Sequence, residues 1–416
     1  MAETVAVADL RIGMFVHLDL GWMAHPFPLS SFRIACNEEI ATLRGLGLSE
    51  LRWIPEKSCL PLSAPSVAAP AAPSVVSLAA APAPVLTPLQ AQRAAMRQCS
   101  EQYGQASTAL RRAAAQVVDK PEAARRDTEA LTRGLLDKLL AEPEMSILVL
   151  SGGLADKATA HAMNVTIISL LMARAFGLSD DELMDVGVGA LWHDVGKTGM
   201  PPHLQQHDER FDAGELQAYR DHVKHGVALG LRMGLAPGAL QVLAQHHESA
   251  DGSGFPQRLG LDRMTPASRI VSLVNRYEDL CNPGNLARAI TPHEALSRLF
   301  AQSRSKFDAT MLNAFIRMMG VYPAGSIVQL TDDRYAMVVS VNAARPLKPR
   351  VMVHDPEVQR EQALLLNLST AGDIGIRRSL SIAQLPAPAR EFLQPTPRVA
   401  YFFVPSPAPD PAAGLR

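Results

Sequence analysis

The stretch His193-Asp194-Val195-Gly196-Lys197 places an imidazole beside a carboxylate, and both side chains bind divalent metal ions in proteins. More imidazoles follow in His246-His247-Glu248, just before the glycine-rich segment Asp251-Gly252-Ser253-Gly254-Phe255-Pro256. His161 and His222 each lie on a segment with a helical pattern. A His-Asp pair alone is common by chance, but five histidines and one aspartate in this arrangement predict a metal site.

The places of these residues in the helical pattern favour one shared site. His193 and Asp194 end one predicted helix, and His246 and His247 end a later one. His161 lies near the start of an apolar helix, where a lone histidine is more often a core side chain than a ligand. Because the other positions recur at helix ends, we expect them to face a common cleft.

Asp194 is the natural bridging ligand, because a carboxylate can bind two cations while imidazoles fill the outer positions. Mixed imidazole and carboxylate ligands suit iron, manganese or zinc better than calcium. Two such ions can convert a bridging water to hydroxide near neutral pH and hold a phosphate. Lys197 is then expected to neutralise charge on that phosphate. The alternative for Lys197 is a solvated cap at a helix C-terminus.

Composition limits the class of protein. The chain has 416 residues, 47% of them hydrophobic, and a net charge of −1, so bulk attraction to nucleic acid or to a membrane surface is not expected. Four scattered cysteines without Cys-x-x-Cys spacing indicate neither a disulfide framework nor a zinc knuckle. No signal peptide or membrane-spanning run is evident, so a cytoplasmic protein is expected.

Changes in composition divide the chain into five parts, and the predicted fold class is mainly α. Residues 1–60 are expected to form a small α+β module, followed by a Pro/Ala-rich linker over 61–88. Residues 89–150 are predicted as a helical connector, with a dimerising surface (a homodimer) as the alternative. Residues 151–323 are helical almost throughout, and residues 324–416 contain strand patterns that predict a β-rich appendix and tail.

Helix starts within the helical region carry recognisable local signals. Capping boxes are predicted for three pairs, Ser179 with Glu182, Asp212 with Glu215, and Thr291 with Glu294. Thr87-Pro88 and Thr265-Pro266 each place a capping hydroxyl before a proline at the first helical position.

Residues 161–323 resemble an HD-GYP domain, a subgroup of the HD-domain metal-dependent phosphohydrolases, which are all-helical bundles. The stretch from His193 to Lys197 matches the His-Asp-x-Gly-Lys motif of that family. The stretch from His246 to Pro256 matches its second motif, which ends in Gly-Tyr-Pro, at every position but one. Arg11-Ile-Gly-Met-Phe-Val16 is similar to a small module of unknown function that often precedes such domains.

The resemblance implies hydrolysis of cyclic di-GMP, or of a related cyclic dinucleotide, to linear product and/or GMP at a binuclear site holding iron or manganese. It implies metal ligands at His161, His193, Asp194, His222, His246, His247 and Asn275. It implies catalytic roles for Asp194 and Lys197, and substrate contacts from Lys197, Asp251, Gly252, Gly254, Phe255, Pro256 and Arg288. Contacts of the Gly-Phe-Pro loop with diguanylate cyclase domain proteins are implied more weakly.

Two departures from the family pattern affect the metal ligands. Asn275 stands where the family has an aspartate, and it offers a carbonyl oxygen without charge, so the second ion should bind less tightly. Asp279 shares the helical face of Asn275, whereas Glu278 does so only partly. Lys157 stands one turn before His161, where a glutamate would support a third ion, so a third ion is not expected.

Two further departures affect the substrate contacts. Phe255 keeps the aromatic ring of the family's tyrosine but lacks its hydroxyl. Arg288 is the only basic residue where the family often has an Arg-x-Tyr-Lys/Arg run that clamps phosphate.

Three functions stay open on this evidence. An active cyclic di-GMP phosphodiesterase is favoured, because Asp194, Lys197 and all five histidines are present. A metal-bound cyclic dinucleotide receptor or signalling scaffold with little turnover is favoured by Asn275, Phe255 and the missing clamp. A phosphohydrolase of other phosphate esters fits the His-Asp core but not the Gly-Phe-Pro loop.

Overall fold

The structure is a computed structural model that describes residues 3–18, 31–34, 40–41, 43–44, 48–55, 58, 87–141, 145–150, 156–341, 347–363, 365–396 and 398–405. The chain divides into two compact units, one within residues 1–95 and the other mainly over residues 96–416. Most of the linker predicted over 61–88 lies outside the described residues.

The first unit contains a four-stranded antiparallel sheet in the order β1-β4-β2-β3. Its strands are β1 (Glu3–Ala6), β2 (Phe15–His17), β3 (Ser31–Arg33) and β4 (Glu50–Trp53). Val16 and Leu51 are buried in these strands, and the Trp53 indole N–H donates to the Ser58 hydroxyl at 2.8 Å. The sheet predicted for the N-terminal module is therefore present.

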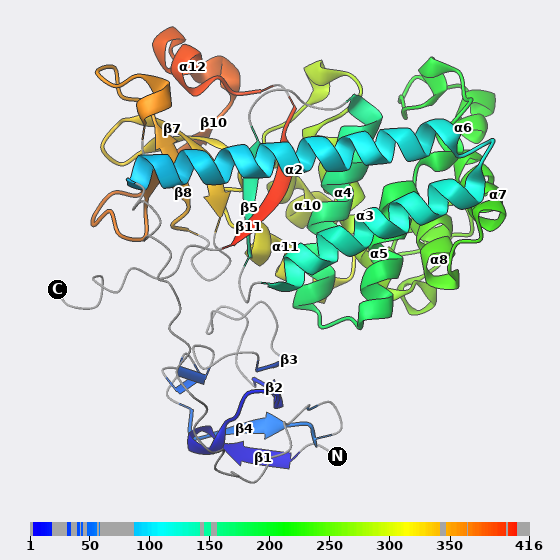
Figure 1. The fold of residues 1–416 in the computed structure, drawn as a ribbon, viewed down its shortest axis with the longest axis horizontal. Helices are drawn as coiled ribbons and strands as arrows, with labels where there is room; N and C mark the ends of the chain where they lie inside the picture. Colours follow the sequence, from blue (N-terminus) through cyan, green and yellow to red (C-terminus); the bar gives the residue numbers. More distant parts are fainter. Residues whose placement is uncertain are drawn as a thin grey trace, which may run out of the picture. The chain divides into compact units, whose positions relative to one another are not determined.

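Helices form most of the second unit (Figure 1), so the mainly α fold class is confirmed. They are α2 (Pro88–Gln116), α3 (Pro121–Ala141), α4 (Lys157–Ala175), α5 (Asp180–Trp192), α6 (Ala213–Arg220), α7 (His222–Met233), α8 (Pro237–Gln245), α9 (Pro266–Cys281), α10 (Pro292–Gln302), α11 (Ala309–Met319) and α12 (Ala387–Leu393). All three predicted capping boxes form, because a Ser, Asp or Thr side chain accepts from the backbone of the glutamate three residues later. Within the described residues, no helix has both the length and the apolar character needed to cross a membrane.

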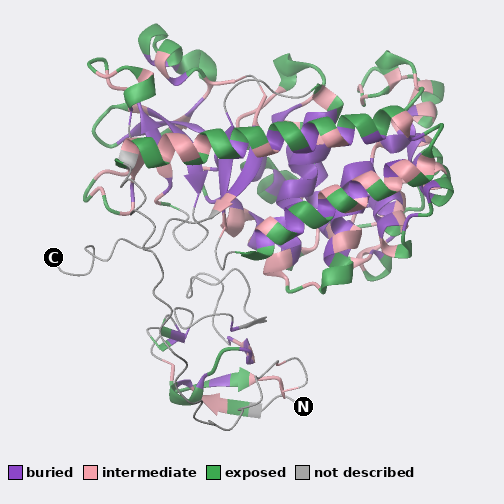
Figure 2. Ribbon diagram, in the orientation of Figure 1, coloured by how far each residue is buried: buried purple, intermediate pink, exposed green. Residues whose placement is uncertain are grey.

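Helix α4 is the central helix of the second unit. It is apolar around most of its circumference, and nearly every residue from Thr159 to Ala173 is buried. A helix of this composition must be covered on several sides, and α5, α9 and strand β11 pack against it. Figure 2 shows this buried centre under helices whose outer faces are exposed.

A seven-stranded antiparallel sheet lies beside the helices in Figure 1. Its strands are β5 (Met145–Leu150), β6 (Ile327–Leu330), β7 (Tyr335–Val341), β8 (Arg350–Val353), β9 (Leu365–Asn367), β10 (Ile376–Leu380) and β11 (Ala400–Pro405). The order is β10-β6-β7-β5-β11, with β8 also paired to β7 and β9 paired to β8. The predicted β-rich C-terminal region is confirmed.

One part of the predicted organisation is wrong, because residues 145–150 of the expected helical connector form strand β5. β5 pairs with β7 and, over its whole length, with β11, so that Leu148 lies opposite Phe402. A short apolar run does not distinguish a strand from a buried helix by periodicity. The buried residues of sheet and helices form one hydrophobic core, so the sheet is more than an appendix.

Candidate metal centre

Five histidines converge from the ends of four helices. His161 lies in the second turn of α4, His193 caps the C-terminus of α5, and His222 is the first residue of α7. His246 caps the C-terminus of α8, and His247 follows it. Their ring nitrogens lie close to one another and to the Asp194 carboxylate. The structure therefore brings together the histidines that the sequence pattern predicts as ligands.

Asp194 lies between two pairs of these imidazoles. Its Oδ2 atom is 3.6 Å from Nε2 of His161 and 3.6 Å from Nε2 of His193. Its Oδ1 atom is 3.5 Å from Nε2 of His222 and 3.8 Å from Nε2 of His246. Each oxygen of one carboxylate thus faces its own pair of imidazole nitrogens, as a ligand that bridges two ions must.

Gly196 allows the turn that carries His193 and Asp194 to approach α7 closely. A Cβ atom at this position would lie 1.8 Å from the carbonyl oxygen of His222 and 2.5 Å from the amide nitrogen of Gly226. No side chain fits between these backbones. The glycine of the motif is therefore needed for packing next to a predicted ligand.

Backbone hydrogen bonds orient three of the imidazoles. In each, Nδ1–H donates to the carbonyl oxygen three residues earlier, which belongs to Ala190 for His193 (2.7 Å), to Tyr219 for His222, and to Leu243 for His246 (2.8 Å). This bond places the proton on Nδ1 and leaves the lone pair of Nε2 free. The free lone pairs point into the cluster around Asp194.

His161 is oriented differently, by a carboxylate. Its Nδ1 forms a short hydrogen bond with Oε2 of Glu278, whose side chain is 1% exposed. Burial alone would lower the pKa of His161, but the Glu278 carboxylate outweighs burial and raises it to about 9. A carboxylate behind a histidine fixes the ring and strengthens its other nitrogen as a ligand. Glu278 therefore positions His161, a role that the helical spacing did not reveal.

Two asparagines tie Glu278 to strand β11. Asn164 Nδ2 donates to Glu278 Oε1 (3.1 Å) and to the carbonyl of Val399 (2.8 Å), while its Oδ1 accepts from the Tyr401 amide (3.0 Å). Asn282 Nδ2 donates to the same Glu278 oxygen (2.8 Å), and its Oδ1 accepts from the Val399 amide (2.9 Å). The C-terminal strand therefore supports the network that holds His161.

Burial keeps most of the cluster histidines neutral. It lowers the pKa of His193 to about 4 and holds the pKa values of His246 and His247 well below the usual range. Burial also opposes ionisation of Asp194, but Lys197 and the surrounding imidazoles outweigh it and lower the pKa of this carboxyl. Near neutral pH the neutral imidazoles of His193, His246 and His247 therefore surround an ionised Asp194.

The cluster fits a divalent metal ion. Three of its buried polar atoms make no hydrogen bond within the described residues, namely Asp194 Oδ1, His247 Nε2 and Asn275 Oδ1. An unsatisfied buried acceptor is costly unless something binds it. All three atoms can act as metal ligands, and the mixed imidazole and carboxylate set suits iron, manganese or zinc.

Lys197 is part of the cluster and is not a solvated cap. Its Nζ donates to Asp194 Oδ2 at 2.6 Å and lies 5.5 Å from the centre of the Tyr219 ring. Its side chain is only 19% exposed. Burial would lower the pKa of Lys197, but Asp194 outweighs burial and raises it. The site therefore holds a permanent cation beside the bridging carboxylate.

Asn275 lies on α9, one turn before Glu278 and Asp279. Its side chain is 3% exposed, and residues three and four apart share a helix face. Atoms of His161, Glu278 and Asp279 also lie close enough together to share an ion. Glu278 is already occupied by His161 and the two asparagines, so Asn275 and Asp279 are the groups of α9 with free oxygens.

The segment after His247 is held by Glu248, whose role the motif alone did not reveal. The buried Glu248 carboxylate accepts from the amides of Gln257 (2.7 Å) and Leu259 (2.9 Å). A Cβ atom at Gly254 would lie 2.5 Å from the Glu248 Cα, so only glycine fits there. Phe255 stacks on His247, with ring centres 4.6 Å apart. The loop is therefore anchored directly on the predicted ligands.

Other residues predicted to contact substrate have structural partners. Asp251 is exposed and accepts from the Ser253 amide at 3.0 Å, which shapes the turn that Gly252 enters with φ of 74°. Arg288 is 46% exposed and lies 3.8 Å from an Asp208 oxygen. Neither Asp251 nor Arg288 touches the histidine cluster in a described contact, so their substrate roles stay predictions.

Comparisons with known proteins agree with this geometry. Residues 3–128 match a domain of unknown function (DUF3391), and residues 145–311 match the HD domain. A protein of Pseudomonas aeruginosa named a cyclic di-GMP phosphodiesterase is 26% identical over 359 residues, covering 85% of each chain. A Vibrio cholerae protein named a 3'3'-cGAMP-specific phosphodiesterase is 27% identical over 159 residues, covering 38% of this chain and 30% of that protein.

Among solved structures, an HDG"Y"P protein of Bdellovibrio bacteriovorus is similar with a TM-score of 0.42 and 14% identity, covering 76% of this chain and 98% of that one. The two family matches cover residues 3–128 and 145–311. The chain therefore carries an HD domain behind an N-terminal domain of unknown function, which confirms the resemblance seen in its motifs.

Proposed function

We propose that this chain is a metal-dependent phosphodiesterase that hydrolyses cyclic di-GMP to the linear dinucleotide and/or GMP at a site for two divalent ions, iron or manganese. The observation that carries the proposal is the Asp194 carboxylate, whose two oxygens each face a separate pair of imidazole nitrogens. The name of the similar Pseudomonas aeruginosa protein supports the choice of substrate.

The ligands divide into two groups around Asp194. His161, His193 and Asp194 would hold one ion, with Asn275 as the fourth ligand, and Asp194, His222, His246 and His247 would hold the other. When bound, two such ions activate water near neutral pH and withdraw charge from a phosphate.

The chain's own residues complete the chemistry. Lys197 is a buried cation beside Asp194, so it can donate hydrogen bonds to a phosphate oxygen as negative charge develops there. The neutral imidazoles keep their lone pairs available at physiological pH. Glu278 and the carbonyl acceptors fix the rings, so little reorganisation is needed for binding.

The test is a paired measurement on anaerobically purified protein. Metal content is measured together with conversion of cyclic di-GMP to linear dinucleotide or GMP, with iron or manganese supplied. Two ions and turnover are expected, and 3'3'-cGAMP and cyclic di-AMP serve as competing substrates. Bound metal without turnover of any of these would leave a receptor or scaffold and reject the proposal.

A further inference from the structure

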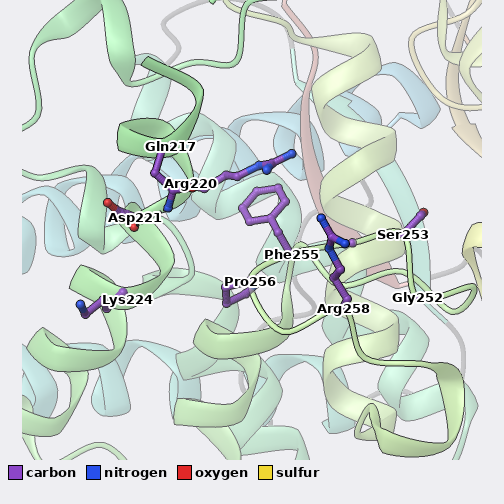
Figure 3. Close-up of a pocket in the computed structure, with 10 residues that line it drawn as sticks. Gln217, Arg220, Asp221, Lys224, Gly252, Ser253, Phe255, Pro256 and Arg258 are labelled. Carbon is purple, nitrogen blue, oxygen red and sulfur yellow. Dashed lines mark hydrogen bonds between the residues drawn. The ribbon is translucent and has the colours of Figure 1, made fainter. Parts of the chain in front are cut away.

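A cavity lies beside Phe255, whose ring stacks on His247. It has a volume of about 380 Å³ and is lined by Gln217, Arg220, Asp221, Lys224, Gly252, Ser253, Gly254, Phe255, Pro256 and Arg258. Figure 3 shows Arg220 reaching across the Phe255 ring from one wall, with Arg258 beside the ring on the other. The cavity therefore adjoins the metal centre through one aromatic side chain.

The lining of this cavity is strongly cationic. Arg220, Lys224 and Arg258 contribute three positive charges against the one negative charge of Asp221, whose carboxylate accepts from the Gln217 amide at 3.0 Å. In the described part of the chain none of the three cations has an ion pair. The Nε atom of Arg220 is buried without a hydrogen-bond partner. An unpaired buried donor in a lining with an excess of positive charge indicates a place for an anion.

Both walls of the cavity are fixed to predicted metal ligands. Arg220 ends α6 and Lys224 lies in the first turn of α7, on either side of His222 in the chain. Arg258 lies between Gln257 and Leu259, whose amides donate to the Glu248 carboxylate. Glu248 directly follows the predicted ligand His247 in the chain. Its backbone adopts φ of 55°, which residues other than glycine rarely do. The backbone positions of Arg220 and Arg258 are therefore fixed next to the predicted ligands.

The Phe255 ring stacks on His247, with ring centres 4.6 Å apart, and the Arg220 guanidinium lies over the ring at 5.5 Å from its centre. The Phe255 ring therefore already has two partners, and the cavity offers a ligand positive charge rather than an aromatic surface on which a base could stack. Arginines bind phosphate oxygens with paired N–H donors. A phosphate matches this lining better than a purine base does.

From these observations we infer that the cavity is a second phosphate subsite, which binds the phosphodiester of the cyclic dinucleotide that is not being cleaved. This inference rests on the proposed function. The cations of this cavity, from α6, α7 and the segment of the Gly-Phe-Pro loop, would replace the phosphate clamp that the chain lacks around Arg288. Arg220 and Arg258 would be the specificity residues, because a substrate with a single phosphate cannot occupy both sites.

The test compares Arg220→Gln and Arg258→Gln with Arg298→Gln, which replaces an exposed arginine of α10 that does not line the cavity. Calorimetry of the metal-loaded protein gives Kd for cyclic di-GMP, and kinetics give kcat/KM for cyclic di-GMP and for bis(p-nitrophenyl) phosphate, which has one phosphate. We expect Kd for cyclic di-GMP to rise about tenfold in each of the two variants. The loss in kcat/KM should be about tenfold larger for cyclic di-GMP than for the single-phosphate ester.

An unchanged Kd in both variants, or the same rise in Arg298→Gln, would overturn the subsite. Equal losses on both esters would also overturn it, because the arginines would then act through the metal centre. Wild-type protein that binds cyclic di-GMP without hydrolysing it would reject the proposed function, while the Kd comparison would still decide the subsite. Wild-type protein that fails to bind cyclic di-GMP would reject the subsite outright.

Discussion

The two sides of the Asp194 carboxylate differ in how fully the protein satisfies them. On the Oδ2 side, Lys197 donates a hydrogen bond at 2.6 Å, and His161 is held by the buried Glu278 carboxylate. On the Oδ1 side, no donor reaches the oxygen within the described residues, and His247 Nε2 also has no partner. Within the described residues, the Oδ1 side therefore leaves two buried acceptors unsatisfied, whereas the Oδ2 side leaves only Asn275 Oδ1 without a partner.

This difference predicts two ion sites of unequal affinity. The ion among His222, His246 and His247 would satisfy orphaned atoms, and it faces no competing cation. The ion between His161 and His193 must share Asp194 Oδ2 with Lys197, and Asn275 offers it no charge. The first ion should therefore bind tightly and the second more weakly.

Replacing Asp194, the ligand that both ions share, should abolish both metal sites at once. Asp194→Ala is expected to remove both ions and to lower cyclic di-GMP hydrolysis by about a thousandfold or more, because several kcal/mol of charge stabilisation leave with the ions. Metal analysis of the purified variant checks this, with the exposed Asp262→Ala as the control. An Asp194→Ala protein that keeps two ions would show that this carboxylate does not bridge them.

Removing the cation should separate chemistry from metal binding. Lys197→Ala is expected to keep both ions and to lower kcat by about 10²- to 10³-fold, the usual cost of losing one stabilising donor. The measurement is the rate under metal saturation together with metal content, beside Lys120→Ala as an exposed control. Loss of metal from Lys197→Ala would contradict the role given to this lysine.

The support behind His161 can be weakened without touching a ligand. Glu278→Gln is expected to reduce affinity for the weaker ion by about 10- to 100-fold, since it removes the charge that orients this imidazole. The tighter ion should be retained, as it should be in the exposed control Glu209→Gln. Competition with a metal-sensitive dye measures both affinities, and equal loss of the two ions would refute a role confined to one side.

A carboxylate at position 275 should reduce the difference in affinity between the two metal sites. Asn275→Asp is expected to tighten the weaker ion by about tenfold, because a carboxylate replaces an uncharged carbonyl oxygen. The same titration applied to Asn313→Asp, on α11, controls for an added charge elsewhere. No change in the affinity of Asn275→Asp would mean that another group, such as Asp279, already fills the position.

Local sequence signals predicted much of this site. The capping boxes at Ser179, Asp212 and Thr291 form because each involves residues three apart in the chain. The cluster around His193 and Asp194 was recognisable because its motif is contiguous and its partners end helices. Such patterns depend on a few neighbouring residues, which a single sequence displays.

Contacts between distant segments were not predictable in the same way. Glu278 meets His161 across 117 residues, so helical spacing alone did not reveal that it would orient a ligand. Strand β5 was missed because its partner β11 lies at the other end of the second unit. Arg220 and Arg258, which line the cavity beside Phe255, come from two segments that meet only in the folded chain.

The most direct test of the account is a metal titration of the stripped wild-type protein under anaerobic conditions. Two ions per chain are expected, the second bound at least about tenfold more weakly than the first. His247→Ala should abolish binding of the tightly bound ion, and His161→Ala should abolish binding of only the weakly bound ion. A single ion, or two ions of equal affinity that both survive these substitutions, would contradict the account of Asp194 as a bridge between unequal sites.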